Sequence, residues 1–281
     1  MTDTGLPPNT VQEKGTLKSP AGDDIAWIAD GPMPAEDAQA PCGFFWLGGF
    51  MSDMSGSKAT ALAALANATK RSFVRFDYSG HGASGGRFEE GTIGKWLNEA
   101  EAVFRQVAKG PRVLVGSSMG GWIALLLARR LLREDPQQAR RIRGMVLLAP
   151  ATDMTKDLMW DLFSEDMRQT LTHEGRIAIP SEYGPEPYVI TKDLVEEGMN
   201  HLILEEGLSV PWPVRILQGE ADADVPWRHG LKTFEALSGD DITFTLVKGG
   251  DHRLSTPRDL QMLGETVLAL CARADKAAHT A

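Results

Sequence analysis

The serine of a Gly-x-Ser-x-Gly pattern is the residue of this sequence best placed for covalent chemistry. Gly116-Ser-Ser118-Met-Gly120 follows the β-branched run Val113-Leu-Val115 and precedes a stretch rich in leucine and alanine. The two glycines permit a turn from strand to helix that is too tight for side chains and that lifts the Ser118 hydroxyl above a sheet. The amide of Met119, at the start of the helix, can donate to a developing oxyanion. The pattern predicts Ser118 as a nucleophile.

The same pattern occurs a second time, at Gly82-Ala-Ser84-Gly-Gly86. No apolar run leads directly into it, and Arg-Phe-Glu-Glu follows in place of a helix start. Context is what gives this motif its meaning, so we predict that Ser84 is a loop residue. Ser117 does not occupy the serine position of the first Gly-x-Ser-x-Gly pattern, so it is not a candidate nucleophile.

A serine hydroxyl is a weak nucleophile until a base removes its proton. In folds with this type of turn, the chain order is serine, then Asp or Glu, then histidine. His252 follows the final strand-like run, in Lys-Gly-Gly-Asp-His252-Arg, and the double glycine leaves its loop free to direct the ring. The other histidines precede the serine, start a helix, or lie in a helical segment or the C-terminal tail: His81, His173, His201, His229 and His279. We therefore predict His252 as the base.

The acid that orients this histidine should follow the strand before the last. That position reads Gln-Gly219-Glu-Ala-Asp222-Ala-Asp224-Val-Pro and offers three carboxylates. Glu220 lies closest to the strand, and Asp224 could cap the next helix. Spacing alone leaves Asp222 and Asp224 as alternatives.

A second oxyanion donor is expected in the loop after the first strand of the core. The sequence there is Leu47-Gly48-Gly49-Phe50-Met51. The glycines allow the backbone to approach a substrate closely, so the Phe50 amide is the candidate donor.

Short apolar runs alternate with helical patterns along the chain. Runs of this length that are rich in β-branched and aromatic residues are typical of buried parallel strands, and the alternation predicts a parallel sheet covered by helices. The predicted strands are 43–47, 72–76, 111–115, 144–148, 213–217 and 242–247, and the predicted helices are 57–70, 92–108, 119–133, 227–237 and 257–272. Residues 10–30 are expected to form an antiparallel hairpin at the sheet edge, with its turn at 20–22.

Residues 151–211 interrupt this alternation, because they contain apolar residues at helical spacing and no strand-like run. They predict a helical cap inserted after the sixth strand. Residues 1–150 and 212–281 would then form the core, with one structural domain overall. Trp122, Met159 and Trp160 are candidates for lining an acyl pocket.

Composition narrows the function further. The 281 residues are 42% hydrophobic, with a net charge of −9 and a pI of about 5.2. Such an acidic surface disfavours nucleic acid and anionic membranes as partners, and no apolar run is long enough to span a membrane. Cys42 and Cys271 form no ligand cluster, so no metal site is expected. The polar N-terminal stretch resembles neither a secretory nor a transit signal, which favours the cytoplasm.

These motifs resemble the α/β-hydrolase superfamily, and more narrowly its branch of mitochondrial palmitoyl-protein thioesterases and acyl-glucuronide esterases. The likeness extends from 49 to 260 and is weakest in the cap. It rests on Gly49-Phe50, Arg75-Phe-Asp-Tyr-Ser-Gly80, Gly94-Lys-Trp96, Val115-Gly-Ser-Ser-Met-Gly-Gly-Trp122, Asp222-x-x-Val-Pro-Trp227 and Asp251-His-Arg253. The resemblance implies Asp222 as the acid. Position 48 is Gly where many hydrolases carry His, so the second donor is expected from the Phe50 backbone alone.

The resemblance implies an α/β-hydrolase fold and a serine hydrolase of small-molecule carboxylic esters or thioesters. The reaction would proceed through an acyl-enzyme on Ser118 and require neither a metal nor an organic cofactor. A peptidase or amidase of the same fold, or a binding protein that has lost catalysis, remain the alternatives. The oligomeric state is left open.

Overall fold

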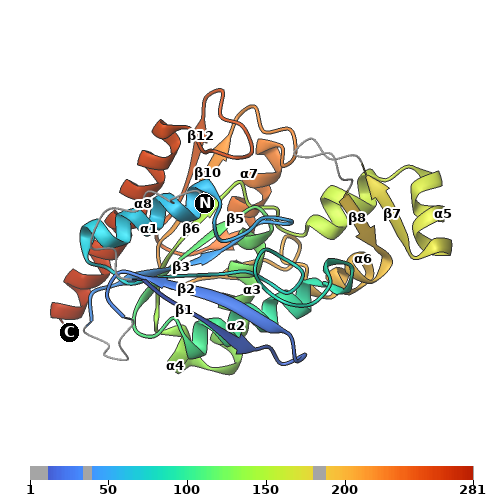
Figure 1. Ribbon diagram of the computed structural model, residues 1–281. Helices are drawn as coiled ribbons and strands as arrows, with labels where there is room; N and C mark the ends of the chain where they lie inside the picture. Colours follow the sequence, from blue (N-terminus) through green and yellow to red (C-terminus); the bar gives the residue numbers. More distant parts are fainter. Residues whose placement is uncertain (1–11, 34–39, 180–187, 281) are drawn as a thin grey trace.

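The computed structural model describes residues 12–33, 40–179 and 188–280. Within them, eight strands form one sheet in the order β1-β2-β4-β3-β5-β6-β10-β12 (Figure 1). These strands are β1 (Gln12–Lys18), β2 (Asp24–Asp30), β3 (Gly43–Leu47), β4 (Phe73–Phe76), β5 (Arg112–Ser117), β6 (Ile142–Leu148), β10 (Val214–Gly219) and β12 (Ile242–Val247). The six strands from β4 to β12 run parallel to one another, and β2 is antiparallel to both of its neighbours, β1 and β4.

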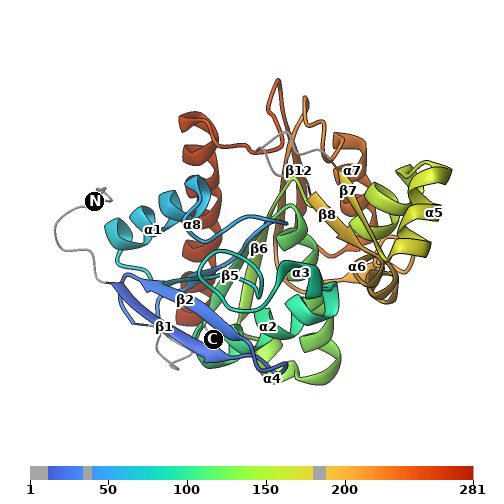
Figure 2. The same cartoon turned by 45° about the vertical axis from the view of Figure 1, so that its right-hand side comes forward.

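Helices cover both faces of the sheet (Figures 1 and 2). They are α1 (Ser57–Thr69), α2 (Ile93–Gln106), α3 (Met119–Glu134), α4 (Pro136–Ala139), α7 (Trp227–Ala236) and α8 (Pro257–Thr280). The first core strand, β3, is buried along its whole length and alternates its side chains between two cores. Phe44 and Trp46 pack on the α1 and α8 side, whereas Phe45 and Leu47 pack on the α2 and α3 side. Burial on both faces explains why this strand is a continuous apolar run.

The predicted edge hairpin is present, with β1 pairing β2 in register from Gln12 opposite Asp30 to Lys18 opposite Asp24. Residues 10 and 11, where its prediction began, lie outside the described part of the chain. The predicted strands and helices of the core agree with the structure to within a few residues, except that α8 extends to Thr280 rather than 272.

Residues 151–211, which we call the insertion, are not purely helical, so that part of the prediction was wrong. Besides α5 (Glu165–Glu174) and α6 (Lys192–Gly198), the insertion contains an antiparallel pair of strands, β7 (Arg176–Ile179) and β8 (Tyr188–Thr191). It also contains β9 (Leu208–Ser209), which pairs with β11 (Leu237–Ser238). The strands β7 and β8 are four residues each and depend on packing rather than on a long apolar run: their Ile177 and Ile190 are buried with Phe163 and Val195 of the insertion. The hairpin and α5 lie at the opposite end of the molecule from α1 and α8 (Figures 1 and 2).

The order of the parallel strands gathers the predicted site residues at one edge of the sheet. The carboxyl ends of β3, β5, β10 and β12 lead into the loops that carry Phe50, Ser118, Asp222 and His252. Ligands of open α/β sheets bind beyond the carboxyl ends of the strands. No helix among the described residues is long and apolar enough to cross a membrane.

Candidate active site

Ser118 occupies a strained turn between β5 and α3. Its backbone has φ 54° and ψ −121°, a conformation that an L-residue adopts only when its surroundings enforce it. A Cβ added at Gly120 would overlap the carbonyl oxygens of Leu47 and Gly48, and one added at Gly116 would overlap the Gly120 carbonyl. The glycines of the motif are therefore required by close packing of backbone against backbone, and the turn presents a partly exposed Ser118 at the start of α3.

Ser118, His252 and Asp222 form a continuous chain of hydrogen bonds. His252 Nε2 lies 3.1 Å from Ser118 Oγ, and His252 Nδ1 lies 2.9 Å from Asp222 Oδ2. The Asp222 carboxylate is fully buried, whereas the imidazole is 18% exposed. With Nδ1–H donating to the carboxylate, Nε2 is free to accept the serine proton. This is the arrangement of nucleophile, base and orienting acid.

The Asp222 carboxylate is held by three further donors. Its Oδ1 accepts the amides of Asp224 and Val225 at 3.0 and 2.8 Å, and its Oδ2 also accepts Gln218 Nε2 at 2.9 Å. The buried Gln218 was missed by sequence reasoning. The signal that could have found it is a polar side chain near the end of an apolar strand, directly before Gly219.

The structure separates the three carboxylates that the sequence left close together. Glu220 forms an ion pair with Lys248 and accepts the Gly249 amide at 3.1 Å, so it connects the loop that carries Asp222 to the loop that carries His252. The Ala221 amide donates to the Gly250 carbonyl at 2.8 Å across the same two loops. Asp224 lines the cleft described below.

The loop that carries Phe50 lies directly against Ser118. A Cβ added at Gly49 would come 3.3 Å from the Ser117 carbonyl oxygen and 3.4 Å from Ser118 Cβ. The amide of Met119, the first residue of α3, follows Ser118 immediately. The backbones of both predicted oxyanion donors, Phe50 and Met119, are therefore adjacent to the predicted nucleophile.

A cleft of about 730 Å³ opens above Ser118 and His252, between the core and the insertion. Most of the apolar side chains in its wall come from the insertion, among them Met154, Leu158, Met159, Phe163, Ile179 and Ile190. Of the three candidates for lining an acyl pocket, Met159 lines the cleft and Trp122 is fully buried in the core, whereas Trp160 packs against the apolar cluster of the insertion and is not part of the wall. The core side of the wall carries polar and charged side chains, among them Asp53, Lys58 and Arg253. A cleft that joins an apolar wall to convergent polar groups is typical of a small-molecule site.

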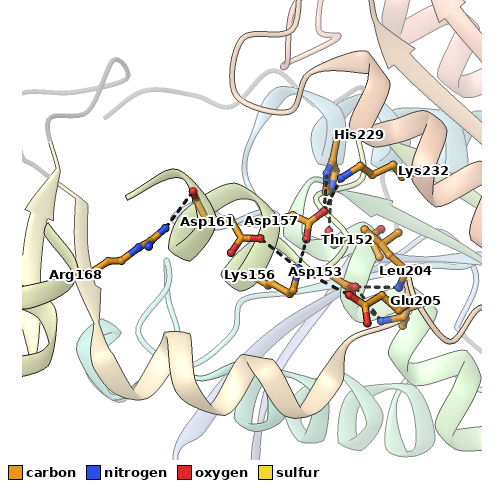
Figure 3. Close-up of polar contacts among 11 residues, drawn as sticks. Thr152, Asp153, Lys156, Asp157, Asp161, Arg168, Leu204, Glu205, His229 and Lys232 are labelled. Atoms are coloured by element: carbon orange, nitrogen blue, oxygen red, sulfur yellow. Dashed lines mark hydrogen bonds and ion pairs between the residues drawn. The ribbon is translucent and has the colours of Figure 1, made fainter. Parts of the chain in front are cut away.

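A second cavity, of about 550 Å³, is polar and lies at the base of the insertion (Figure 3). Lys156 Nζ lies 3.3 Å from Asp157 Oδ1 and 3.2 Å from Asp161 Oδ2, and Lys232 Nζ lies 2.8 Å from Asp157 Oδ2. The Asp153 carboxylate accepts the Leu204 amide at 2.9 Å. These contacts fasten both ends of the insertion to each other and to α7. They anchor the helical turn Thr155–Met159, whose Leu158 and Met159 face the cleft.

One set of side chains in the described part of the chain has the spacing of metal ligands: Asp222, Asp224 and His252, whose ligand atoms lie within 4.8 Å of one another. The hydrogen bonds above already engage Asp222 Oδ1 and Oδ2 and both ring nitrogens of His252. The geometry is that of a proton-transfer chain.

Lys58 of α1 also lines the cleft, and its Nζ donates to the Arg253 carbonyl next to His252. Burial lowers the pKa of Lys58 from 10.5 to about 8, against the attraction of Asp251. Between these two values the unfolded chain binds a proton that the folded chain does not, so the free energy of unfolding contributed by Lys58 rises with pH in this window.

We expect the unfolding free energy of wild type minus that of Lys58→Met to increase by about 2 kcal/mol from pH 7.5 to pH 10.5. This value is reduced from the full effect of the pKa shift because solvent reaches part of the side chain. Denaturant unfolding of both proteins across this range measures the difference. Lys18→Met, at an exposed lysine, is the matched control. A difference that stays constant from pH 7.5 to 10.5 contradicts the prediction.

Comparison with known proteins agrees with this geometry. Residues 49–184 match the family described as serine aminopeptidase, S33. The chain is 32% identical over 222 residues to the mitochondrial palmitoyl-protein thioesterase ABHD10 of Rattus norvegicus, covering 79% of this chain and 72% of the relative.

Among solved structures, a protein described as a hydrolase from Agrobacterium vitis S4 superposes with a TM-score of 0.86 at 41% identity, covering 93% of this chain and 99% of the other. The α/β-hydrolase domain-containing protein 10 from mouse superposes with a TM-score of 0.79 at 28% identity, with the same coverage. The predicted α/β-hydrolase fold is confirmed.

Proposed function

This chain belongs to the α/β-hydrolase family of the palmitoyl-protein thioesterase ABHD10 and is an ester or thioester hydrolase, and from that premise we propose that it removes medium to long acyl chains through an acyl-enzyme on Ser118. The observation that supports this proposal is the hydrogen-bonded chain Ser118–His252–Asp222 at the floor of an apolar cleft. The proposed chemistry uses only the chain's own side chains, and the absence of a cofactor remains a prediction.

In the first half of the proposed reaction, His252 Nε2 removes the Ser118 proton as Oγ attacks the acyl carbonyl carbon. Asp222 keeps the proton of the ring on Nδ1 and stabilises the imidazolium that forms. The amides of Met119 and Phe50 donate to the oxyanion of the tetrahedral intermediate. The intermediate collapses to an acyl-enzyme, and His252 gives its proton to the departing thiol or alcohol.

In the second half, water replaces the leaving group. His252 removes a proton from the water, which attacks the ester of Ser118, and the same two amides hold the oxyanion again. The collapse of this intermediate returns the proton to Ser118 and releases the carboxylic acid. The apolar wall contributed by the insertion holds the acyl chain throughout.

The chain-length profile tests the substrate class. Burial of one methylene contributes about 0.8 kcal/mol, so kcat/KM for p-nitrophenyl esters is expected to rise about fourfold per added methylene until the cleft is filled. The series runs from acetate to palmitate, together with the corresponding acyl-CoA thioesters and an S-palmitoylated peptide. A profile that is highest at acetate and falls with every added methylene contradicts an acyl-binding cleft.

A matched pair of variants locates the acyl chain. Phe163 is 7% exposed and lines the cleft, whereas its neighbour Leu162 is 70% exposed and is not part of the wall. Phe163→Ala should move the optimum toward longer chains, and Leu162→Ala should leave the profile unchanged. Equal effects of both substitutions would show that the acyl chain lies elsewhere.

The same assay separates the remaining alternatives. An amidase or peptidase would cleave aminoacyl p-nitroanilides with a turnover that Ser118→Ala abolishes, and a binding protein without catalysis would not be labelled by a fluorophosphonate. For the compartment, the prediction from sequence is the cytoplasm, whereas the curated relatives are named mitochondrial proteins. Fractionation of cells expressing the chain with a C-terminal tag decides between the two.

A further inference from the structure

His81 lies in the loop after β4 and touches the loop of the predicted oxyanion donor. Its side chain is buried, and no step of the proposed reaction uses it. Ring nitrogen Nδ1 lies 3.1 Å from the Ser79 carbonyl oxygen, and Nε2 lies 3.2 Å from the Met51 amide nitrogen. A carbonyl oxygen only accepts and a backbone amide only donates. The two contacts therefore require a neutral ring with its proton on Nδ1 and a bare Nε2.

The ring is held in this orientation from several sides. The rings of Phe88 and Trp96 meet it edge-on, each with centroids 5.2 Å away. Trp96 Nε1 donates to the same Ser79 carbonyl at 3.2 Å, and the Ser79 amide donates to Glu99 at 2.9 Å. Burial also lowers the pKa of His81, which favours the neutral ring.

The Met51 amide belongs to a four-residue turn that runs from Gly49 to Ser52. The Ser52 amide and hydroxyl both donate to the Gly49 carbonyl, at 3.2 and 2.9 Å. Met51, the third residue of the turn, has φ 54°. A left-handed third residue is the requirement of a type II turn and is normally met by glycine. A methionine in this position is strained.

Two neighbouring peptide groups of this turn are thus held separately. Ser52 holds the group that contains the Gly49 carbonyl and the Phe50 amide, and His81 holds the group that contains the Phe50 carbonyl and the Met51 amide. Type I and type II turns differ by a rotation of that central peptide group. Without an acceptor for the Met51 amide, the turn could relieve the strain at Met51 by this rotation. The rotation would turn the Phe50 carbonyl away, and the Phe50 amide, which is joined to it through the same Cα, would then be restrained only through the contacts of Ser52 with Gly49.

We propose that His81 is a positioning residue for the oxyanion hole: its bare Nε2 holds the Met51 amide and so keeps the Phe50 amide directed at the oxyanion. This inference rests on the proposed function. It makes His81 a determinant of transition-state stabilisation without contact with the substrate.

Two amide variants separate the two contacts of the ring. Gln extends its side-chain amide to the region of Nε2 and can accept from Met51, whereas Asn reaches only the region of Nδ1 and retains the Ser79 contact alone. We expect His81→Asn to lower kcat on the best ester about 10- to 100-fold, somewhat less than the loss of a complete oxyanion donor, with KM within about twofold. His81→Gln should recover most of that loss.

The strain at Met51 supplies a second, independent test. Glycine adopts a positive φ without cost, so His81→Asn should lower kcat much less in a Met51→Gly background than in wild type. Binding of a trifluoromethyl ketone, which forms an oxyanion adduct on the serine, should weaken in parallel with kcat, whereas binding of the product acid should not change. If His81 had only a structural role, His81→Asn would lower the melting temperature. It would not change kcat relative to wild type, nor the affinity for the ketone relative to that for the product acid.

Nitrogen-15 NMR of the wild-type protein tests the tautomer directly and depends on no variant. A proton on Nδ1 and a bare Nε2 are expected at pH 7, and a proton on Nε2 overturns the proposal. It is also overturned if His81→Asn folds and keeps its kcat, or if neither His81→Gln nor Met51→Gly rescues it. Ser118→Ala in the same assay keeps the two proposals apart, because an inactive wild type or an active Ser118→Ala contradicts the proposed function and not the tautomer.

Discussion

Ser118→Ala is expected to lower kcat for ester hydrolysis by about a millionfold, the size of loss that removing a serine nucleophile from a Ser-His-Asp set produces. The substitution deletes the atom that would carry the acyl group and the hydroxyl that lies 3.1 Å from His252 Nε2. It leaves the apolar wall of the cleft intact, so affinity for the product acid should persist. Hydrolysis of p-nitrophenyl esters and labelling by a fluorophosphonate measure the loss of the nucleophile, and calorimetric titration with the product acid measures the retained affinity.

The second Gly-x-Ser-x-Gly pattern supplies the control. Ser84 Oγ accepts the Ala26 amide at 2.8 Å and donates to the Asp77 carbonyl at 2.6 Å, so it links its loop to strand β2 and to the end of β4. Ser84→Ala should retain labelling while losing about 1–3 kcal/mol of unfolding free energy, because two polar groups lose their partner. Labelling that disappears with Ser84 and survives the loss of Ser118 would contradict the assignment of the nucleophile.

Asp222→Asn is expected to lower kcat about 10⁴-fold. An amide in place of the carboxylate no longer stabilises the imidazolium and allows the wrong tautomer of His252. The local contacts of Asp222 add a loss of stability to this loss of activity. Oδ2 faces Gln218 Nε2, and Oδ1 faces the amide of Val225, so the new NH₂ group meets a donor in either orientation. We therefore also expect a loss of about 1–3 kcal/mol in unfolding free energy.

Asp224→Asn is the matched control for this experiment, since it removes the same charge two residues away. Asp224 offers its backbone amide to Asp222, and that amide is unaffected by the substitution. The variant should keep most of its kcat on p-nitrophenyl esters. A larger loss of kcat from Asp224→Asn than from Asp222→Asn would show that Asp224, and not Asp222, is the acid.

The sequence alone determined the core fold and the position of Ser118, because the signals for both are local. Alternating apolar runs and helical patterns define parallel strands and their helices, and the strand–Gly-x-Ser-x-Gly–helix order occupies ten consecutive residues. Context within the same stretch also separated Ser118 from Ser84. The order of elements further restricted the predicted base to His252, since the only other histidine after the last strand of the sheet, His279, lies near the C-terminus.

The choice of acid depended on contacts that are distant in sequence. Asp222 and Asp224 have equal claims by spacing, and the resemblance to relatives was needed to prefer Asp222. The structure brings Asp222 to His252, 30 residues away, because β10 and β12 are neighbours in the sheet. The pairing of strands, which no short segment encodes, decides which carboxylate faces the imidazole.

The insertion and the supporting residues of the site were decided by tertiary structure for the same reason. The four-residue strands β7 and β8 carry too few residues for a periodic signal and are stabilised by the apolar cluster around Phe163 and Ile190. His81 and Gln218 act through side-chain contacts with loops from other strands. Local patterns determined which groups could react, whereas packing between distant segments decided what holds them in place.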